Sequence, residues 1–200
     1  KGVLFTDAHS TPLCAPSRYM LLSGNYAHRG RLISGTWGLG NSGQFMPYQK
    51  SIADVLRTEA GYETAVFGKW HLGAKIPPNG MQSDRVGSVI THIGHNWSLP
   101  LIQGPGDIGF DKSYVTMSGL QNAPFSFFRD DHLTTDPLDV EYWQPGYYNT
   151  TYGKSQITEY GEGDPSWDST AFDMILVNET RTFIENHLEN RPDDPFFAYV

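Results

Sequence analysis

The only cysteine of the chain opens the segment Cys14-Ala-Pro-Ser-Arg18-Tyr-Met-Leu-Leu-Ser-Gly24. Proline is tolerated in the first turn of a helix and glycine is favoured just after its end, so Pro16 and Gly24 predict a helix over about residues 16–23. Because Arg18 follows Cys14 by one helical turn, both side chains can face the same small volume. Unpaired N–H groups at the helix start also attract an anion. Attack on a sulfate or phosphate ester requires such a set of groups, and these residues alone do not choose between the two esters.

A second informative block, Gly68-Lys69-Trp70-His71-Leu72-Gly73, follows a predicted buried strand over residues 64–67. Ligands of open α/β sheets bind at the carboxyl ends of strands, which is where this block falls. In an extended segment Lys69 and His71 point to one face and Trp70 to the other. This pairing suits a site that binds a dianionic group and also handles a proton.

Both blocks resemble signatures of the formylglycine-dependent sulfatases of the alkaline phosphatase superfamily. The first resembles C-x-P-S-R followed by L-[ST]-G, the second resembles the family's later signature, and they stand in the family's order. The resemblance implies that a formylglycine-generating enzyme oxidises Cys14 to an aldehyde, whose hydrate attacks the sulfur of a sulfate monoester. It further implies that Lys69 binds the sulfate and the hydrate, that His71 orients or deprotonates the hydrate, and that Arg18 holds the hydrate and its loop.

A third element, Gly109-Phe110-Asp111, resembles the Gly-Phe-[Asp/His] element that follows the second signature in sulfatases. About thirty-five residues intervene here, which departs from the usual spacing. Some family members use a serine or histidine downstream of this element to touch sulfate. Ser118 is the candidate that this resemblance offers for substrate binding.

The resemblance also implies one divalent cation, Ca²⁺ in preference to Mg²⁺, held by oxygen ligands. Of the expected ligands only Cys14, as formylglycine, lies in this chain, and the acidic pairs and further histidine that the family uses would lie outside it. We therefore predict that residues 1–200 alone lack a complete metal site and are inactive.

Two other groups contain ligand-type residues. His92 and His95 are three residues apart, but no further ligands follow at a familiar spacing, which favours a surface loop. Asp130-Asp131-His132 imitates a strand ending in an acidic pair, but it lies downstream of the cysteine, whereas the sulfatase metal pair lies upstream. We interpret this group as a solvated turn.

The elements alternate as in an α/β fold, with a mixed or largely parallel sheet flanked by helices and incomplete in this chain. Strands are predicted near residues 2–6, 64–67 and 195–200, and helices over 16–23, from Ser51 to Gly61 and over about 169–190. Phe172, Ile175, Leu176, Phe183 and Leu188 predict the buried face of the last helix. We interpret residues 1–200 as one partial sulfatase catalytic domain, with a loop-rich insertion over about 74–168 and no second domain.

Aromatic side chains within the insertion have two open interpretations. They form either a wall for an aryl or sugar group, or a small satellite core under long loops. The residues concerned are Trp97, Phe125, Phe127, Phe128, Tyr142, Trp143, Tyr147 and Tyr148.

Net charge and composition restrict the kinds of partner that the chain can bind. A net charge of −8 argues against a nucleic acid or an acidic membrane as the general partner, although Arg18 and Lys69 can still form a local site for an anionic sulfate ester. No apolar run is long enough for a transmembrane segment, and no signal peptide is visible. Sequons at Asn96, Asn149 and Asn178 favour glycosylation on a secretory route, whether extracellular, lysosomal or periplasmic.

Three rival functions stay open. A phosphonate or phosphodiester hydrolase of the same superfamily shares the cysteine signature. A non-catalytic member would keep Cys14 as a thiol and bind sulfated ligands. A cysteine phosphatase would use the thiolate directly, but its phosphate loop resembles C-x5-R, whereas Cys14 and Arg18 form C-x3-R.

Overall fold

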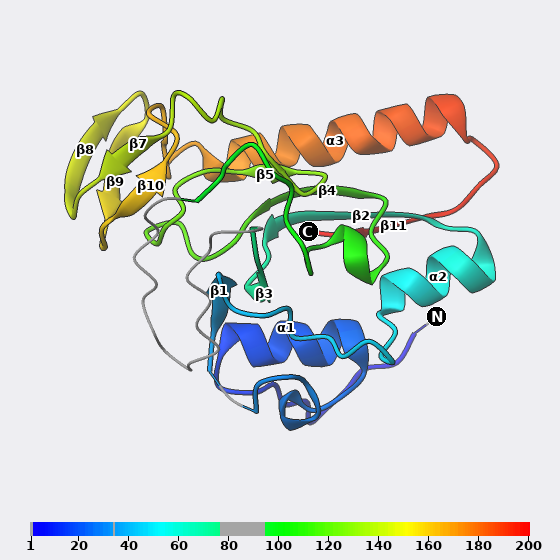
Figure 1. The fold of residues 1–200 in the computed structure, drawn as a ribbon. Helices are drawn as coiled ribbons and strands as arrows, with labels where there is room; N and C mark the ends of the chain where they lie inside the picture. Colours follow the sequence, from blue (N-terminus) through cyan, green and yellow to red (C-terminus); the bar gives the residue numbers. More distant parts are fainter. Residues whose placement is uncertain (1, 34, 77–94) are drawn as a thin grey trace.

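The computed structural model describes residues 2–33, 35–76 and 95–200. Its centre is a five-stranded mixed sheet in the order β11-β2-β4-β5-β6, in which β11, β2 and β4 run parallel and β5 and β6 antiparallel. These strands are β2 (Glu63–Lys69), β4 (Lys112–Thr116), β5 (Phe128–Arg129), β6 (His132–Leu133) and β11 (Phe196–Tyr199). Helix α3 (Phe172–Asn190) covers one face, and α1 (Cys14–Ser23) and α2 (Ile52–Ala60) lie on the other (Figure 1). The predicted α/β class with a mixed sheet between helices is confirmed.

Two apolar clusters fill the two faces of the sheet. Successive strand residues point to opposite faces, so Val66 belongs to the cluster with α1, whereas its neighbours Ala65 and Phe67 belong to the cluster with α3. Val115 and Tyr114 divide in the same way on β4. This two-sided burial is typical of the parallel part of an α/β sheet.

Local capping explains where the first two helices begin and end. Gly24 ends α1 and Gly61 ends α2, each in the left-handed conformation that glycine adopts without steric penalty. The Ser51 hydroxyl accepts a hydrogen bond from the backbone N–H of Asp54 and so caps the start of α2. The three predicted helices are confirmed, and so are the predicted strands over 64–67 and near 195–200.

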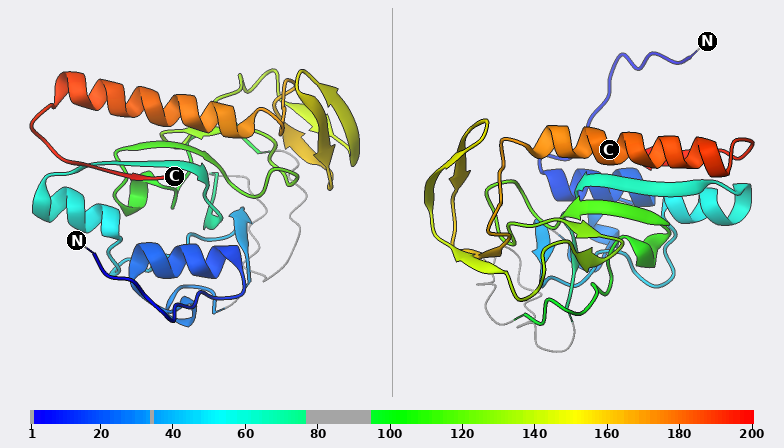
Figure 2. Two further views of the ribbon diagram at one scale, coloured as in Figure 1. Left: turned by 180° about the vertical axis from the view of Figure 1, so that it is seen from behind. Right: turned by 90° about the horizontal axis from the view of Figure 1, so that it is seen from above.

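Smaller elements surround the main sheet. Strand β1 (Trp37–Leu39) pairs in parallel with β3 (Leu72–Ala74), and β7 (Glu141–Trp143) pairs with β10 (Gly161–Gly163). Strands β8 (Gly146–Thr150) and β9 (Gly153–Ile157) form a hairpin. In both views of Figure 2 the strands β7–β10 project beyond one end of the main sheet. Two short 3₁₀ turns, η1 (Ala27–Arg29) and η2 (Gly106–Ile108), complete the described elements.

Two expectations are wrong. Residues 2–6 form no strand, because their apolar side chains are exposed and lack a sheet partner, and this segment runs away from the body in Figure 2 (right). The described part of the segment 74–168 is rich in loops, but it also supplies three strands of the central sheet and four of the outer strands. Leu188 is 55% exposed; the buried position near that end of α3 is His187.

No helix among the described residues is both long and apolar enough to cross a bilayer.

Candidate active site

Cys14 lies between two side chains from a distant part of the chain. Its exposed Sγ is 3.3 Å from Nδ1 of His71 and 3.4 Å from Nζ of Lys69. The structure therefore brings together the cysteine of the first block with the lysine and histidine of the second. A sulfur atom in contact with both an imidazole and an ammonium forms an arrangement that can hold an anion and accept a proton.

Helix α1 fixes the position of Cys14, which is its first residue. The N-cap position, Leu13, offers no side-chain acceptor to the first turn of the helix. The Ser17 hydroxyl instead contacts the carbonyl oxygens of Leu13 and Thr11, and so ties the preceding loop to the helix. The anion-binding role that the sequence pattern predicts for this helix start stays a prediction.

Backbone pairing to β4 fixes Lys69 and His71. The N–H of Trp70 donates to the carbonyl of Thr116, and the N–H of His71 donates to the carbonyl of Met117. Trp70 itself is buried, and its indole N–H donates to the carbonyl of Gly73. These contacts hold the turn that carries both polar side chains.

The expected extended geometry is wrong at one residue. His71 has φ = 59°, a left-handed conformation that non-glycine residues seldom adopt, so the chain turns there rather than continuing as a strand. Gly73 follows with φ = 77°, and a Cβ at that position would lie 2.3 Å from the carbonyl oxygen of Ser42. The tight turn, not strand alternation, brings His71 onto Cys14.

Arg18 connects α1 to two strands. Its Nη1 donates to the carbonyl of Lys69 at 2.7 Å and to the hydroxyl of Tyr199 at 3.3 Å. The guanidinium carbon is also 6.0 Å from the centre of the Tyr199 ring, within reach of a cation–π interaction. Arg18 thus orients the backbone that carries Lys69. Sequence reasoning missed Tyr199, which stands 181 positions from Arg18 and belongs to no recognised block.

The charge state of His71 follows from its surroundings. Burial, then the nearby Lys69 ammonium and Arg18 guanidinium, lower the pKa of His71 to about 3. The imidazole is therefore neutral at physiological pH and retains a lone pair for a proton.

Ser118 lies close to this site but contacts other atoms. It follows β4, and a Cβ on Gly38 would lie 2.5 Å from the Ser118 hydroxyl oxygen. The next residue, Gly119, lies close to Lys69, since a Cβ on Gly119 would be 4.0 Å from Nζ of Lys69. Phe110 of the third block packs edge-on against Trp70 and so stabilises the turn that carries Lys69 and His71.

The described residues do not by themselves fit a divalent cation. Across residues 2–33, 35–76 and 95–200, no three histidine, cysteine or acidic side chains gather in a way that could hold a metal ion. The group nearest to Cys14 Sγ besides His71 is the Lys69 ammonium, which disfavours a cation unless more carboxylates are supplied.

The two rejected ligand groups are explained by packing. His92 lies outside the described residues, while the ring of His95 packs edge-on against Trp97. Asp130 and Asp131 form the expected turn between β5 and β6, both at positive φ. Asp131 is less solvated than expected: burial raises the pKa of its carboxyl to about 6, and one oxygen accepts a hydrogen bond from the Gly106 N–H.

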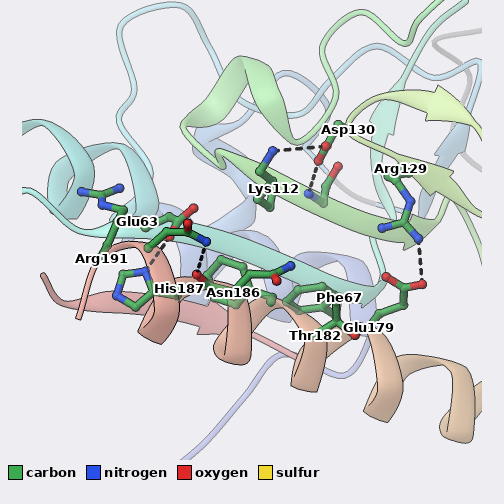
Figure 3. Close-up of a pocket in the computed structure, with 13 residues that line it drawn as sticks. Glu63, Phe67, Lys112, Arg129, Asp130, Glu179, Thr182, Asn186, His187 and Arg191 are labelled. Atoms are coloured by element: carbon green, nitrogen blue, oxygen red, sulfur yellow. Dashed lines mark hydrogen bonds and ion pairs between the residues drawn. The ribbon is translucent and has the colours of Figure 1, made fainter.

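A polar groove of about 550 Å³ lies elsewhere, between α3 and strands β2, β4 and β5 (Figure 3). An Arg129–Glu179 ion pair crosses it, and His187 pairs with Glu63 at its other end. None of Cys14, Arg18, Lys69 or His71 lines it. We place the reactive site at Cys14, because the groove contains neither a nucleophile beside a base nor a free anion-binding set.

Most of the aromatic residues in the insertion belong to the apolar clusters. Trp97 and Phe128 are buried with α1, while Phe125 and Phe127 are buried with α3. Trp143 and Tyr148 pack partly against the second cluster, whereas Tyr142 and Tyr147 are exposed. The buried members therefore belong to the main core on the two faces of the sheet, rather than to a separate satellite core or a ligand wall. The three sequon asparagines, Asn96, Asn149 and Asn178, are exposed.

Comparison with known proteins agrees with the fold and with the two sequence blocks. The Sulfatase family model matches residues 1–200. An N-acetylgalactosamine-6-O-sulfatase of Bacteroides thetaiotaomicron is 28% identical over all of this chain and 40% of its own length. An arylsulfatase of Klebsiella aerogenes is 31% identical over 66% of this chain and 30% of its own length.

Two solved structures are also similar to this chain in fold. A Bacteroides thetaiotaomicron structure, described in work on glycosaminoglycan metabolism, covers 92% of this chain with a TM-score of 0.65 and 25% identity. A sulfatase from a Pseudoalteromonas species, at 18% identity and a TM-score of 0.51, shares the fold.

A cysteine, a lysine and a histidine thus meet at the carboxyl end of the central strand β2 of an α/β sheet. The chain belongs to the sulfatase family. It spans about 40% of the length of the first of the relatives above, from the N-terminal part of the catalytic region.

Proposed function

We propose that the protein containing this chain hydrolyses a sulfate monoester, with a formylglycine hydrate made from Cys14 as the nucleophile. The observation that carries the proposal is the contact of Cys14 Sγ with both His71 and Lys69, from a block 55 to 57 residues further along the chain. In the structure Cys14 is a thiol, so Sγ stands in for the hydrate oxygens of the modified residue.

The proposed reaction begins when one hydrate hydroxyl loses its proton to solvent and its oxygen forms a bond to sulfur. The bond between sulfur and the alcohol oxygen breaks, and the alcohol leaves with that electron pair and takes up a proton from an acid beyond this chain. His71, neutral because its pKa is lowered to about 3, then removes the proton from the remaining hydroxyl. The C=O bond re-forms, sulfate leaves with the C–O electrons, and water adds to the aldehyde to restore the hydrate. A thiol would lack this exit, because its sulfur adduct carries no second hydroxyl.

Lys69 and Arg18 have different roles in this proposal. The Lys69 ammonium, 3.4 Å from Sγ, is placed to hold the sulfate oxygens and to stabilise charge in the transition state. Arg18 acts through the backbone, because its guanidinium is bonded to the Lys69 carbonyl and Tyr199. Ser118 is proposed as a further sulfate contact. Its hydroxyl lies against Gly38 in the structure, so this role requires the side chain to turn away from Gly38.

The remaining parts of the proposal concern a metal ion, a modifying enzyme, glycosylation and the substrate. A divalent cation, Ca²⁺ in preference to Mg²⁺, would take most of its ligands from beyond this chain. A formylglycine-generating enzyme would modify Cys14, and the exposed sequons would be glycosylated on a secretory route. The name of the first relative supports a sulfated saccharide as the substrate, and we adopt this class for the present chain.

The decisive experiment is the mass of the proteolytic peptide containing Cys14, taken from full-length protein made in its native host. We expect loss of the thiol and reaction with an aldehyde-trapping reagent. A Cys14→Ala protein is the matched control for trapping elsewhere. A free, alkylatable Cys14 would contradict the proposal and favour a non-catalytic binding protein. Competition between aryl-sulfate and aryl-phosphonate substrates then separates a sulfatase from a phosphonate hydrolase.

A further inference from the structure

A short turn beside the Lys69 ammonium carries the partly buried carboxamide of Asn122. The turn covers residues 119–122, and the N–H of Asn122 donates to the carbonyl of Gly119 at 3.2 Å. If Gly119 had a Cβ, that atom would lie 3.0 Å from Oδ1 of Asn122 and 4.0 Å from Nζ of Lys69. Since both atoms lie within 4.0 Å of one point, they are at most twice that distance apart. The carboxamide is therefore a close neighbour of the ammonium that we assign to the sulfate.

Backbone hydrogen bonds fix this turn at both of its ends. Just before it, the carbonyl of Met117 accepts a hydrogen bond from the N–H of His71. Towards its end, the carbonyl of Gln121 accepts hydrogen bonds from both the N–H and the hydroxyl of Thr158. The position of Asn122 beside the active-site turn is thus set by the fold.

The turn does not need the side chain of Asn122. Its closing hydrogen bond uses only backbone atoms, and the carboxamide has no hydrogen-bond partner in the part of the chain that the structure describes. The Cβ position of Gly119 is open as well. Apart from Asn122, Lys69 and the two chain neighbours of the glycine, no described residue has an atom within 4 Å of that position. A space between an ammonium and an unused carboxamide is one that a ligand can enter.

These two groups suit the two parts of a sulfated saccharide. The ammonium attracts the sulfate, and the carbon that bears the ester is only two bonds from sulfur, so hydroxyl groups on nearby carbons lie within a few ångströms of the sulfate. A carboxamide both accepts and donates hydrogen bonds, as a sugar hydroxyl group does. A simple aryl sulfate has no such hydroxyl group. A site that hydrogen-bonds a substrate hydroxyl discriminates against an analogue that lacks it.

We propose that Asn122 is a specificity-determining residue, which hydrogen-bonds a hydroxyl group near the sulfate ester of a saccharide, across the open side of Gly119. This inference rests on the proposed sulfatase function, and it names a residue that favours a saccharide over a simple aryl alcohol. Asn122 contributes to substrate binding and takes no part in breaking the bond between sulfur and the alcohol oxygen.

The test compares two kinds of substrate in the full-length protein: monosulfates of galactose and N-acetylhexosamines, and 4-methylumbelliferyl sulfate, which has no sugar hydroxyl group. Asn122→Ala should lower kcat/KM for the saccharide sulfates by about 3- to 10-fold, mainly through KM, with little change for the aryl sulfate. Gln121→Ala is the matched control, since this neighbouring amide is exposed and its removal should leave both values unchanged. An equal loss for both kinds of substrate would show a merely structural role and would refute the inference.

Two further changes probe the contact itself. Gly119 does not have a positive φ, so the backbone accepts Gly119→Ala, and the added methyl group should produce the same selective loss by filling the open space. Deoxy analogues of the best saccharide substrate form a double-mutant cycle with Asn122→Ala. For one analogue the variant should cause no further loss. If the variant lowers kcat/KM of every analogue as much as that of the parent, the hydrogen bond does not exist.

Binding separates this inference from the proposed function. In full-length protein carrying Cys14→Ala, calorimetric titration with the saccharide sulfates should show Kd rising by a similar factor with Asn122→Ala, but not with Gln121→Ala. If the unaltered protein hydrolyses neither kind of ester and this rise is found, the proposed function fails and the role of Asn122 stands. If Kd does not depend on Asn122, or if no saccharide sulfate binds, the inference is refuted, whether or not the aryl sulfate is hydrolysed.

Discussion

At the scale of single residues, His71 depends on three neighbours for its chemistry. Cys14 contacts its Nδ1, while burial, and then the Lys69 ammonium and the Arg18 guanidinium, lower the pKa of the ring. In the proposed function the Lys69 ammonium would also hold the sulfate, so one cation would both bind the substrate and help to keep the base neutral. A His71 at its ordinary pKa would be partly protonated near pH 6 and would lose that function.

The pH dependence of activity follows from this arrangement. Since the pKa of His71 in the fold is about 3, the base is available above that pH, and no acid limb of kcat near pH 6.5 should come from it. His71→Ala should lower kcat by about 10²- to 10⁴-fold, with less effect on KM. Activity profiles over pH 4–8, together with an NMR titration of the His71 ring assigned by its loss in the variant, check both statements. A ring titrating near 6.5 would overturn the charge argument.

The two sequence blocks predicted the site candidates Cys14, Arg18, Lys69 and His71, because the reactive residue types of each block lie within a few positions of one another. They could not predict Tyr199 as the partner of Arg18, since a hydrogen bond across 181 positions leaves no local pattern. The turn at His71 was equally hidden. Its positive φ depends on hydrogen bonds to β4, not on a turn-forming residue type.

At the scale of elements, a buried ion pair joins α3 to the sheet. His187 near the end of α3 contacts Glu63 at the start of β2, and its other ring nitrogen lies 2.8 Å from the carbonyl of Asp194, just before β11. The hydrogen bond to Glu63, then that to Asp194, raises the pKa of His187. One side chain thus fastens the ends of three elements.

The stability of this junction should depend on pH. Because the pKa of His187 is higher in the folded than in the unfolded chain, its contribution is full below about pH 6.5 and is lost as pH rises through the folded value. His187→Gln should lower the free energy of unfolding of the full-length protein by roughly 2 kcal/mol at pH 6 and by less at pH 9. Urea titrations at both pH values measure this difference.

Arg181→Gln is the matched control for the same helix. It breaks only an exposed pair with Glu185, so the expected loss is below about 0.5 kcal/mol. An equal loss at pH 6 and pH 9 for His187→Gln would show that packing, not the charged pair, stabilises the junction.

Elements with clear ends were predictable. Ser51, Gly24 and Gly61 mark helix ends through the conformations and hydrogen bonds that these residue types favour. Strands β4, β5 and β6 were missed because they are two to five residues long and lie among turn residues. Their pairing with β2 is a tertiary effect, which a short local window does not contain.

At the scale of the whole molecule, the chain contains the proposed nucleophile Cys14 with Lys69 and His71, but its described residues contain no group of three or more ligands that could hold a metal ion. We expect purified residues 1–200 to show no turnover of an aryl sulfate with added Ca²⁺ or Mg²⁺, while full-length protein from the same host is active. The assay is accompanied by near-ultraviolet circular dichroism, to verify that the shorter protein is folded. Metal-dependent turnover by residues 1–200 would disprove the expectation.

The distance along the chain between Cys14 and His71 also determines how long the ribosome takes to add the second residue after the first. The two residues are 57 positions apart, and ribosomes add about 5–20 residues per second, so roughly 3–11 s pass between the synthesis of one and the other. During this interval the thiol is part of a growing chain whose lysine and histidine partners do not yet exist. The oxidation of Cys14 that we propose would therefore act on an open peptide segment, before Lys69 and His71 come into contact with the thiol.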